Sequence, residues 1–159
     1  MPRKVRIEFA GALYHIVCRG DRREEIFQDD KDRELFLSTL GQVCERCGFI
    51  VHSYVLMRNH YHLLLETPAG NLVAGMKWFQ GTNSVRFNAR HRLTGHLFAG
   101  RYKAVLVERE EPSYGRVVSD YIHLNPARAG LVNGENPRLG SFRWSSFPER
   151  EASAMASGR

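Results

Sequence analysis

The first part of the chain has the pattern of one strand followed by one amphipathic helix. Residues 13–19 are rich in strand-forming side chains and stop at a glycine, which predicts a first strand. Over residues 31–47, apolar side chains recur at helical spacing, and Gly48 follows directly. This pattern predicts an amphipathic helix whose candidate N-caps are Asp29 and Asp30.

Two further strands and a second helix are expected in the middle of the chain. Residues 49–57 and 60–66 are strand-like and are separated only by residues 58–59, so they should form an antiparallel hairpin. Residues 71–90 place apolar side chains on one helical face, with Asn71 as a candidate N-cap. Two glycines within this stretch argue for a less regular helix.

The last predicted elements are a strand over residues 101–108 and a helix over residues 113–124, which is bounded by prolines. Short antiparallel strands combined with hydrophobic helices predict an α+β fold, a ferredoxin-like or RRM-like antiparallel sheet flanked by helices. A chain of 159 residues fits one domain. That domain is expected over residues 1–150, with residues 151–159 as a flexible tail.

Positive charge is concentrated in one stretch. The 23 Lys and Arg against 17 Asp and Glu give a net charge of +6. No acidic residue lies between Glu66 and Glu108, whereas six basic residues do, so this stretch alone carries as much charge as the whole chain. Interleaved aromatic residues add base-stacking positions, a combination that favours nucleic-acid binding. A solvated helix face with core aromatics is the alternative interpretation.

Several classes of protein are not favoured. The N-terminus alternates charged and apolar residues, and no segment approaches the roughly 20 apolar residues of a membrane span, so a cytoplasmic protein without membrane association is expected. An odd number of cysteines, Cys18, Cys44 and Cys47, does not suggest a disulfide framework. Cys44 and Cys47 have no second Cys or His pair at zinc spacing, so no zinc or redox role is expected.

His60 and His62 lie two positions apart in a predicted strand. Side chains at i and i+2 of a strand share a face, about 6.5–7 Å apart, so the two imidazoles can converge on one cation. Two partly buried histidines that hydrogen-bond to the backbone would show the same spacing. The residues alone leave both interpretations open.

Tyr121 and Asn125 lie one turn apart on one face of the last predicted helix. Tyrosine is a weak nucleophile at its ordinary pKa of about 10, and a cation that polarises a phosphodiester would make its attack feasible. The alternative is a tyrosine that packs on the core, with Asn125 as a helix-end cap.

Six separated motifs carry a resemblance to a known family. They are YHIVCRG (14–20), IFQDD (26–30), YVLMRNHYHLLL (54–65), GHLFAGRYK (95–103), YIHLNP (121–126) and WSSF (144–147). In this order they resemble the REP-associated tyrosine transposases, insertion-sequence-like members of the His-hydrophobic-His endonucleases. The resemblance covers about residues 11–147.

The resemblance implies a mechanism and a site. His60 and His62 match the metal ligands, Tyr121 matches the nucleophile, and Asn125 matches a residue that assists at the metal, expected to be Mg²⁺ or Mn²⁺. The implied substrate is single-stranded DNA with hairpin ends, which is cut and rejoined through a 5′-phosphotyrosine. The family includes monomers and homodimers. One departure is Arg58, where the family commonly has proline; altered turn rigidity and an added phosphate contact are expected there.

Candidate DNA contacts follow from the basic stretch and the resemblance. They are Arg19, Arg22, Arg23, Lys77, Arg86, Arg90, Arg101, Tyr102, Lys103 and Arg128. Tyr102 is also the one rival nucleophile, although its place between two basic residues favours a DNA contact. None of the remaining histidines is expected to bind metal; these are His15, His52, His91, His96 and His123.

Two rival functions remain. A catalytically silent DNA-hairpin-binding protein would keep the fold and the basic stretch, but retention of His60, His62, Tyr121 and Asn125 together argues against it. An RNA-binding module of the same shape would not require two strand histidines opposite a helical tyrosine.

Overall fold

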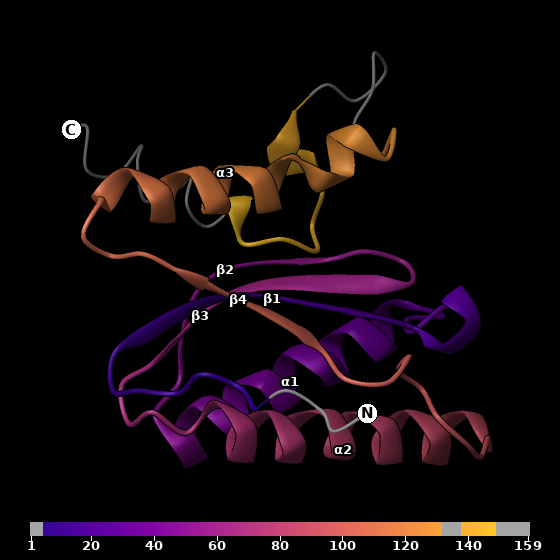
Figure 1. Ribbon diagram of the computed structural model, residues 1–159. Coiled ribbons are helices and arrows are strands. Elements are labelled where there is room, and N and C mark those ends of the chain that lie inside the picture. Colours follow the sequence, from indigo (N-terminus) through magenta and orange to yellow (C-terminus); the bar gives the residue numbers. More distant parts are fainter. Residues whose placement is uncertain (1–4, 132–137, 149–159) are drawn as a thin grey trace.

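The computed structural model describes residues 5–131 and 138–148 (Figure 1). The main elements are, in order, β1 (Ala12–Arg19), α1 (Asp30–Cys47), β2 (Ile50–Leu56), β3 (His60–Thr67), α2 (Leu72–His91), β4 (Lys103–Val107) and α3 (Pro112–Arg128). Two short 3-10 turns accompany them, η1 (Asp21–Arg23) and η2 (Leu139–Ser141). None of these helices is long and apolar enough to cross a membrane. The tail expected at residues 151–159 lies outside the described residues.

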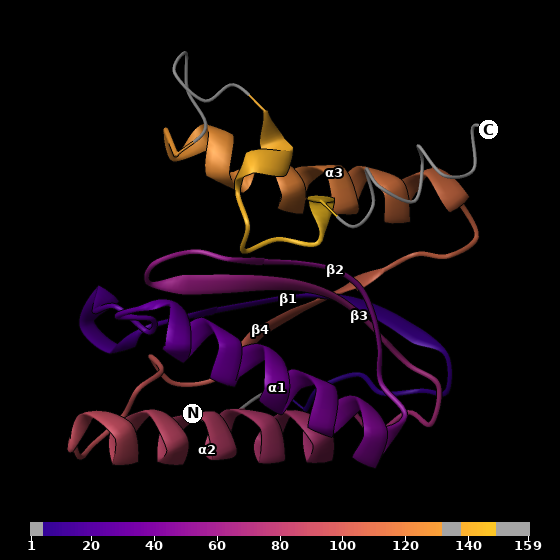
Figure 2. The ribbon, with the colours of Figure 1, turned by 180° about the vertical axis from the view of Figure 1, so that it is seen from behind.

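The four strands form one antiparallel sheet in the order β2-β3-β1-β4, which confirms the α+β, ferredoxin-like prediction. Helices α1 and α2 cover one face of the sheet, and α3 lies over the other (Figures 1 and 2). The register pairs Val17 of β1 with His62 of β3, and His15 of β1 with Val105 of β4. Because paired residues point to the same face, these side chains all lie on the side of α3.

The main core fills the space between the sheet and the two lower helices. Phe36 of α1 lies 5.1 Å from Phe79 of α2 and 4.9 Å from Tyr61 of β3, measured between ring centroids. The backbone of α2 at Gly75 lies directly against the ring of Phe49, which leaves no room for a side chain. A Cβ at Gly75 would come 2.1 Å from that ring. This glycine therefore allows helix and strand layers to approach, and α2 stays helical through it.

The helix ends follow the predicted signals in part. Asp29 is the N-cap of α1 and accepts a hydrogen bond from the backbone N–H of Asp32 at 3.0 Å. Gly48 ends the same helix in the left-handed region, with φ 72°. Asn71 occupies the N-cap position of α2, but its amide donates to the carbonyl of Cys47 at 3.1 Å and does not cap the helix.

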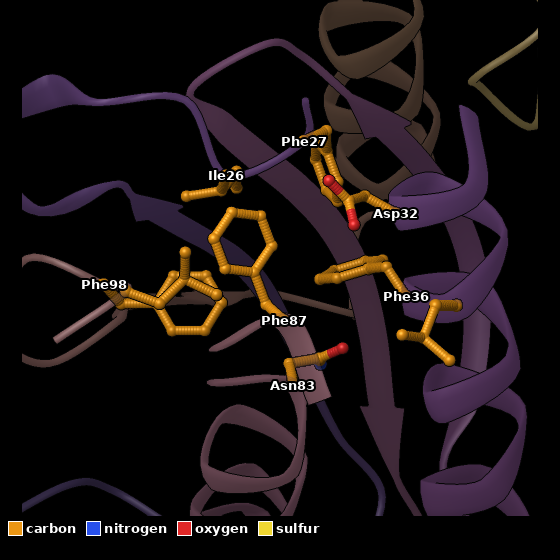
Figure 3. Close-up of a pocket in the computed structure, with 9 residues that line it drawn as sticks. Ile26, Phe27, Asp32, Phe36, Asn83, Phe87 and Phe98 are labelled. Atoms are coloured by element: carbon orange, nitrogen blue, oxygen red, sulfur yellow. The ribbon is translucent and has the colours of Figure 1, made fainter. Parts of the chain in front are cut away.

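A buried carboxylate joins α1 to the end of α2. Asp32 is 4% exposed, and it accepts a hydrogen bond from Arg90 at 2.7 Å and lies 2.8 Å from His91 Nε2. It borders a core cavity of only about 10 Å³, among phenylalanines that include Phe27 and Phe36 (Figure 3). A space of this size holds at most one water molecule, so it is a packing gap and no ligand site.

A smaller core attaches α3 to the opposite face. Ile122 of α3 packs with Val55 and Leu64, which lie on β2 and β3. The segment that follows α3 pairs with the outer edge of β2, where Trp144 accepts a backbone hydrogen bond from Leu56 at 2.8 Å. Helix α3 therefore lies mainly over β2 and β3, and the β1–β4 half of this face is more open.

Candidate active site beneath helix α3

The two histidines of the His-x-His motif face α3 together. His60 is the first residue of β3, and His62 follows on the same side of the strand. Their ring centroids are 5.2 Å apart, with the planes inclined by 74°. The structure thus brings the two imidazoles together as the strand spacing predicted.

In each of these histidines, one ring nitrogen is within hydrogen-bond distance of a neighbouring side chain. Nδ1 of His60 lies 2.8 Å from Oδ1 of Asn59, and Nδ1 of His62 lies 2.9 Å from Nε2 of His15. When Nδ1 carries the hydrogen of a neutral imidazole, the lone pair is on Nε2. A pair of imidazoles held in this way presents two Nε2 atoms as ligands.

Burial keeps both rings in the neutral form that binds metals. Removal from water, followed by positive charge on His15, His60 and Arg19, lowers the pKa of His62 to about 3. Burial, followed by the charge of Arg19, also lowers the pKa of His60. Neither ring therefore needs to lose a proton before it can coordinate a cation near neutral pH.

Tyr121 reaches over the histidines from α3. Its ring centroid lies 6.2 Å from that of His62 and 5.9 Å from that of His15. The side chain is 41% exposed, and the guanidinium carbon of Arg128 lies 4.5 Å from its ring centroid. The predicted nucleophile thus lies beside His62 and His15 and is still accessible from solvent.

Asn125 lies one turn after Tyr121. Its amide nitrogen donates to the carbonyl oxygens of Tyr121 at 3.1 Å and Ile122 at 3.4 Å. The nitrogen is therefore committed to the helix backbone, and Oδ1 is the atom of this side chain that can approach a cation.

A groove of about 520 Å³ opens beside the tyrosine. It is lined by His15, Val17, Cys18, Arg19, His62, Ala99, Arg101, Lys103, Val105 and Tyr121. Three of these side chains are cationic and none is acidic. A groove with this lining favours a polyanion, and its strand floor allows an extended chain to lie along it.

Comparison with known proteins places the chain in a family. A sequence model described as "Transposase IS200 like" matches residues 9–125. The match spans from the residues before β1 to Asn125, and so includes the histidine pair and Tyr121. The chain belongs to the IS200-like transposases. Comparison with curated proteins gives no match.

Two solved structures show the same fold. A REP-associated tyrosine transposase bound to a REP hairpin is similar with a TM-score of 0.75 and 16% identity, over 96% of this chain and 86% of that one. A putative transposase from Deinococcus radiodurans R1 is similar with a TM-score of 0.52 and 19% identity, over 76% of this chain and 95% of that one. The family match and the first of these folds confirm the resemblance that the sequence motifs indicated.

The basic end of the groove in this IS200-like transposase is built by two adjoining segments. Ala99 donates its backbone N–H to the carbonyl of Arg19 at 2.9 Å, and Asp21 donates to Leu97 at 2.9 Å. These bonds hold the loop before β4 against the end of β1, which brings Arg19 near Arg101 although they are far apart in sequence. Local sequence pattern does not show that Arg19 and Arg101 are neighbours, because their proximity depends on β1 and β4 being adjacent in the sheet.

Two further arginines lie in η1, close to the basic end of the groove, where the backbone has an unusual conformation. Arg22 and Arg23 in η1 have φ values of 54° and 59°, in the left-handed region that residues other than glycine seldom adopt. Both side chains are exposed. Asn59, directly before His60, donates to the carbonyl of Arg23 at 3.3 Å, so the loop is attached to the hairpin that carries the histidines.

The other predicted DNA contacts lie elsewhere. Tyr102 is only 8% exposed and turns into the main core, with the Arg6 guanidinium carbon 3.8 Å from its ring centroid, so it offers no face for base stacking. Lys77, Arg86 and Arg90 belong to α2, on the opposite side of the sheet from Tyr121 (Figure 1). The acid-free stretch is continuous in sequence, but the sheet divides it between two faces.

The α2 arginines are already engaged within the protein. Arg86 donates to the hydroxyl of Thr39 and to Oε1 of Gln42, each at 2.7 Å. Arg90 pairs with Asp29 and Asp32 at 2.7 Å, and it is the main reason why the pKa of Asp29 falls to about 2. Both arginines stabilise the contact between α1 and α2.

Arg58 is engaged in the same way. Its guanidinium pairs with Glu25, and its backbone carbonyl accepts from Ile26 at 3.1 Å. The arginine therefore braces the turn before His60 against the loop after η1. The phosphate contact expected for it has no support from this arrangement.

His15 is the site residue that the sequence analysis passed over. It belongs to the predicted first strand, and its neighbours at i−2 and i+2, Leu13 and Val17, lie on the same face. Only the register between β1 and β3 shows that this face also holds His62. The local pattern of apolar and polar residues does not predict which strands, distant in sequence, pair with each other.

Proposed function

We propose that the protein nicks and rejoins hairpin-bearing single-stranded DNA through a covalent bond to Tyr121, with the help of a divalent metal. The observation that carries this proposal is the position of Tyr121 beside His62, whose neutral ring adjoins that of His60, at the side of an open cationic groove. Membership of the IS200-like transposases supports DNA cleavage and transposition as the general activity.

The residues present fit a divalent cation at the histidine pair. His60 and His62 would hold it through their Nε2 atoms, with Oδ1 of Asn125 as a further ligand. Within residues 5–131 and 138–148, no three His, Cys, Asp or Glu side chains are grouped to hold a metal, so oxygen atoms of the DNA and water would complete the coordination. A bound Mg²⁺ or Mn²⁺ would polarise the phosphodiester. Imidazole ligands favour Mn²⁺ in affinity, whereas the abundance of Mg²⁺ in cells favours its use there.

The chemical step is a transesterification in both directions. The hydroxyl oxygen of Tyr121 attacks the phosphorus, and the bond from phosphorus to the 3′ oxygen breaks. The 3′ oxygen gains a proton in place of the one that the tyrosine loses, so the released strand ends in a 3′ hydroxyl. The 5′ phosphate stays on Tyr121 as an ester. A second 3′ hydroxyl can then attack this ester, which rejoins the DNA and restores the tyrosine without ATP.

The proposed DNA contacts are the cations that border the groove and the histidine hairpin. They are Arg19, Arg22, Arg23, Arg101, Lys103 and Arg128. The solved REP-associated transposase of the same fold was bound to a REP hairpin, which supports a hairpin as the partner of this chain as well. Either a monomer or a homodimer agrees with this arrangement.

A hairpin-binding protein without catalysis is the second candidate, because the same cations would serve it. A covalent adduct separates the two. Single-stranded DNA from the flanking genomic region, labelled on the 3′ side of the expected nick, is incubated with the protein and Mn²⁺ and run on a denaturing gel. Label that migrates with the protein supports the transposase, whereas hairpin binding without any adduct would support the silent binder.

A further inference from the structure

His15 contacts both His62, a proposed metal ligand, and Tyr121, the proposed nucleophile. Its Nε2 is 2.9 Å from Nδ1 of His62, and the two rings are nearly parallel, inclined by 20° with centroids 5.2 Å apart. Its ring also meets the edge of Tyr121, with centroids 5.9 Å apart at 73°. We propose that His15 is a positioning residue that accepts a hydrogen bond from Nδ1–H of His62 and so directs the Nε2 lone pair of His62 to the metal. This proposal rests on the metal site proposed above.

The direction of this hydrogen bond decides whether His62 can be a ligand. A neutral imidazole carries one hydrogen, on either Nδ1 or Nε2. If His62 donates from Nδ1, its Nε2 is bare and can coordinate a cation. If His15 were the donor, His62 would carry its hydrogen on Nε2, and that atom could not bind metal. His62 as an Nε2 ligand therefore requires His15 to be the acceptor.

His60 has a corresponding partner on its Nδ1. Nδ1 of His60 lies 2.8 Å from the carbonyl oxygen Oδ1 of Asn59, which can only accept. His60 must therefore be the donor, and its hydrogen is on Nδ1. His15 would do for His62 what Asn59 does for His60, so that both ligands are held in one tautomer. A partner on the second ring nitrogen is the usual means by which proteins orient histidine ligands.

The backbone of β1 makes His15 a rigid partner. Strand β1 is hydrogen-bonded to β3 on one side and to β4 on the other, so it is fixed from both edges. Val17 pairs directly with His62, and His15 lies two positions earlier on the same face. The strand therefore fixes the backbone from which the ring of His15 reaches His62. A side chain on a loop would not give the same constraint.

The tautomer can be measured directly on the metal-free protein. Imidazole ¹⁵N chemical shifts distinguish a protonated from a bare ring nitrogen, and they do not depend on catalysis. In the wild type, we expect His62 to show Nδ1 protonated and Nε2 bare. His15→Leu removes the acceptor and should shift His62 toward the other tautomer. His15→Gln offers a carbonyl oxygen and should restore the wild-type signature at least in part.

Metal affinity gives a second readout. Loss of the free Mn²⁺ signal in electron paramagnetic resonance should show binding about 10- to 100-fold weaker in His15→Leu, since loss of such a partner has effects of this size. His15→Gln should recover much of the affinity. His52→Gln is the control, because His52 lies on β2 and pairs at 3.0 Å with Glu66, which is four positions along β3 from His62. It should leave both readouts unchanged.

Two results would overturn the inference. One is a wild-type His62 with its hydrogen on Nε2, which can be read without any variant. The other is unchanged Mn²⁺ affinity and unchanged tautomer in folded His15→Leu; if that variant does not fold, the wild-type tautomer alone decides the inference. Failure of the proposed function looks different, because the wild type would then bind Mn²⁺ in the expected tautomer but form no DNA adduct.

Discussion

Tyr121 on α3 and His62 on β3 lie with ring centroids 6.2 Å apart, on elements joined by the small apolar core around Ile122. The proposed nucleophile and one proposed metal ligand are thus parts of different layers. Their distance depends on how α3 packs against β2 and β3. Chemistry at this site is therefore sensitive to packing that involves no reacting group.

The first prediction concerns the nucleophile. Tyr121→Phe removes only a hydroxyl from a partly exposed side chain, so folding and hairpin binding should persist while the adduct and strand cleavage disappear. Tyr102→Phe is the matched control, because its hydroxyl is buried and has no hydrogen-bond partner among the described residues. Peptide mapping of the labelled adduct checks the assignment. Label on Tyr102, or wild-type cleavage by Tyr121→Phe, would contradict it.

The second prediction concerns the metal ligands. His62→Ala should abolish cleavage and weaken Mn²⁺ binding, but hairpin affinity should change little because phosphate contacts dominate it. The measurements are calorimetric titration with Mn²⁺ and a gel-shift titration with the hairpin in EDTA. Cleavage by His62→Ala at the wild-type rate, or cleavage by the wild type in excess EDTA, would show that the pair is not a metal site.

The third prediction separates the two groups of cations. Arg101→Gln and Lys103→Gln should each weaken hairpin binding and reduce the slope of log affinity against log salt by about 0.7, the value for one neutralised phosphate of a single strand. Arg90→Gln should leave that slope unchanged, because Arg90 is paired with Asp29 and Asp32. Salt titrations of the three variants are the test. A lower slope in Arg90→Gln alone would place the DNA on α2 instead.

A fourth prediction follows from the pKa of Asp29, which the Arg90 pair lowers from 3.8 to about 2. A carboxyl whose pKa is depressed by folding stabilises the protein above its unfolded pKa, and this contribution is lost as pH falls from about 3.8 toward 2. In Arg90→Gln the midpoint of urea unfolding should therefore fall less between pH 5 and pH 2.5 than in the wild type. An equal fall in both proteins would contradict the pairing.

The fifth prediction compares two glycines of α2. Alanine is the better helix former by up to about 1 kcal/mol, so Gly81→Ala should stabilise the protein, since nothing lies within 4 Å of the added Cβ. Gly75→Ala should instead destabilise it, because its Cβ would meet the ring of Phe49. Urea unfolding of both variants gives the two signs. A gain in stability at both positions would mean that α2 does not approach Phe49 as described.

Local periodicity and boundary signals were enough to predict every main strand and helix, and they placed His60 and His62 on one face. The expected end of the last helix at residue 124 was wrong, because α3 continues through Pro126 to Arg128. Periodicity could not show which strands are neighbours, and so it missed His15, whose partner lies on another strand. Local pattern also could not show which cations of the acid-free stretch share a face of the sheet. Arg90 and Arg101 share that stretch, but Arg90 lies on α2 and Arg101 in the loop before β4. Arg90 pairs with carboxylates on one side of the sheet, and Arg101 borders the groove on the other.

The uncovered β1–β4 half of the sheet has a consequence for how a substrate enters. Strand β4 is the last strand of the sheet, and Val105 on it is 47% exposed beside His15. Within residues 5–131 and 138–148, the groove is therefore open along the edge strand β4 and is not an enclosed tunnel. A DNA strand with folded ends cannot pass through a closed tunnel, but it can enter an open groove from the side. If the proposed function holds, internal sites in long DNA would be as reachable as free ends.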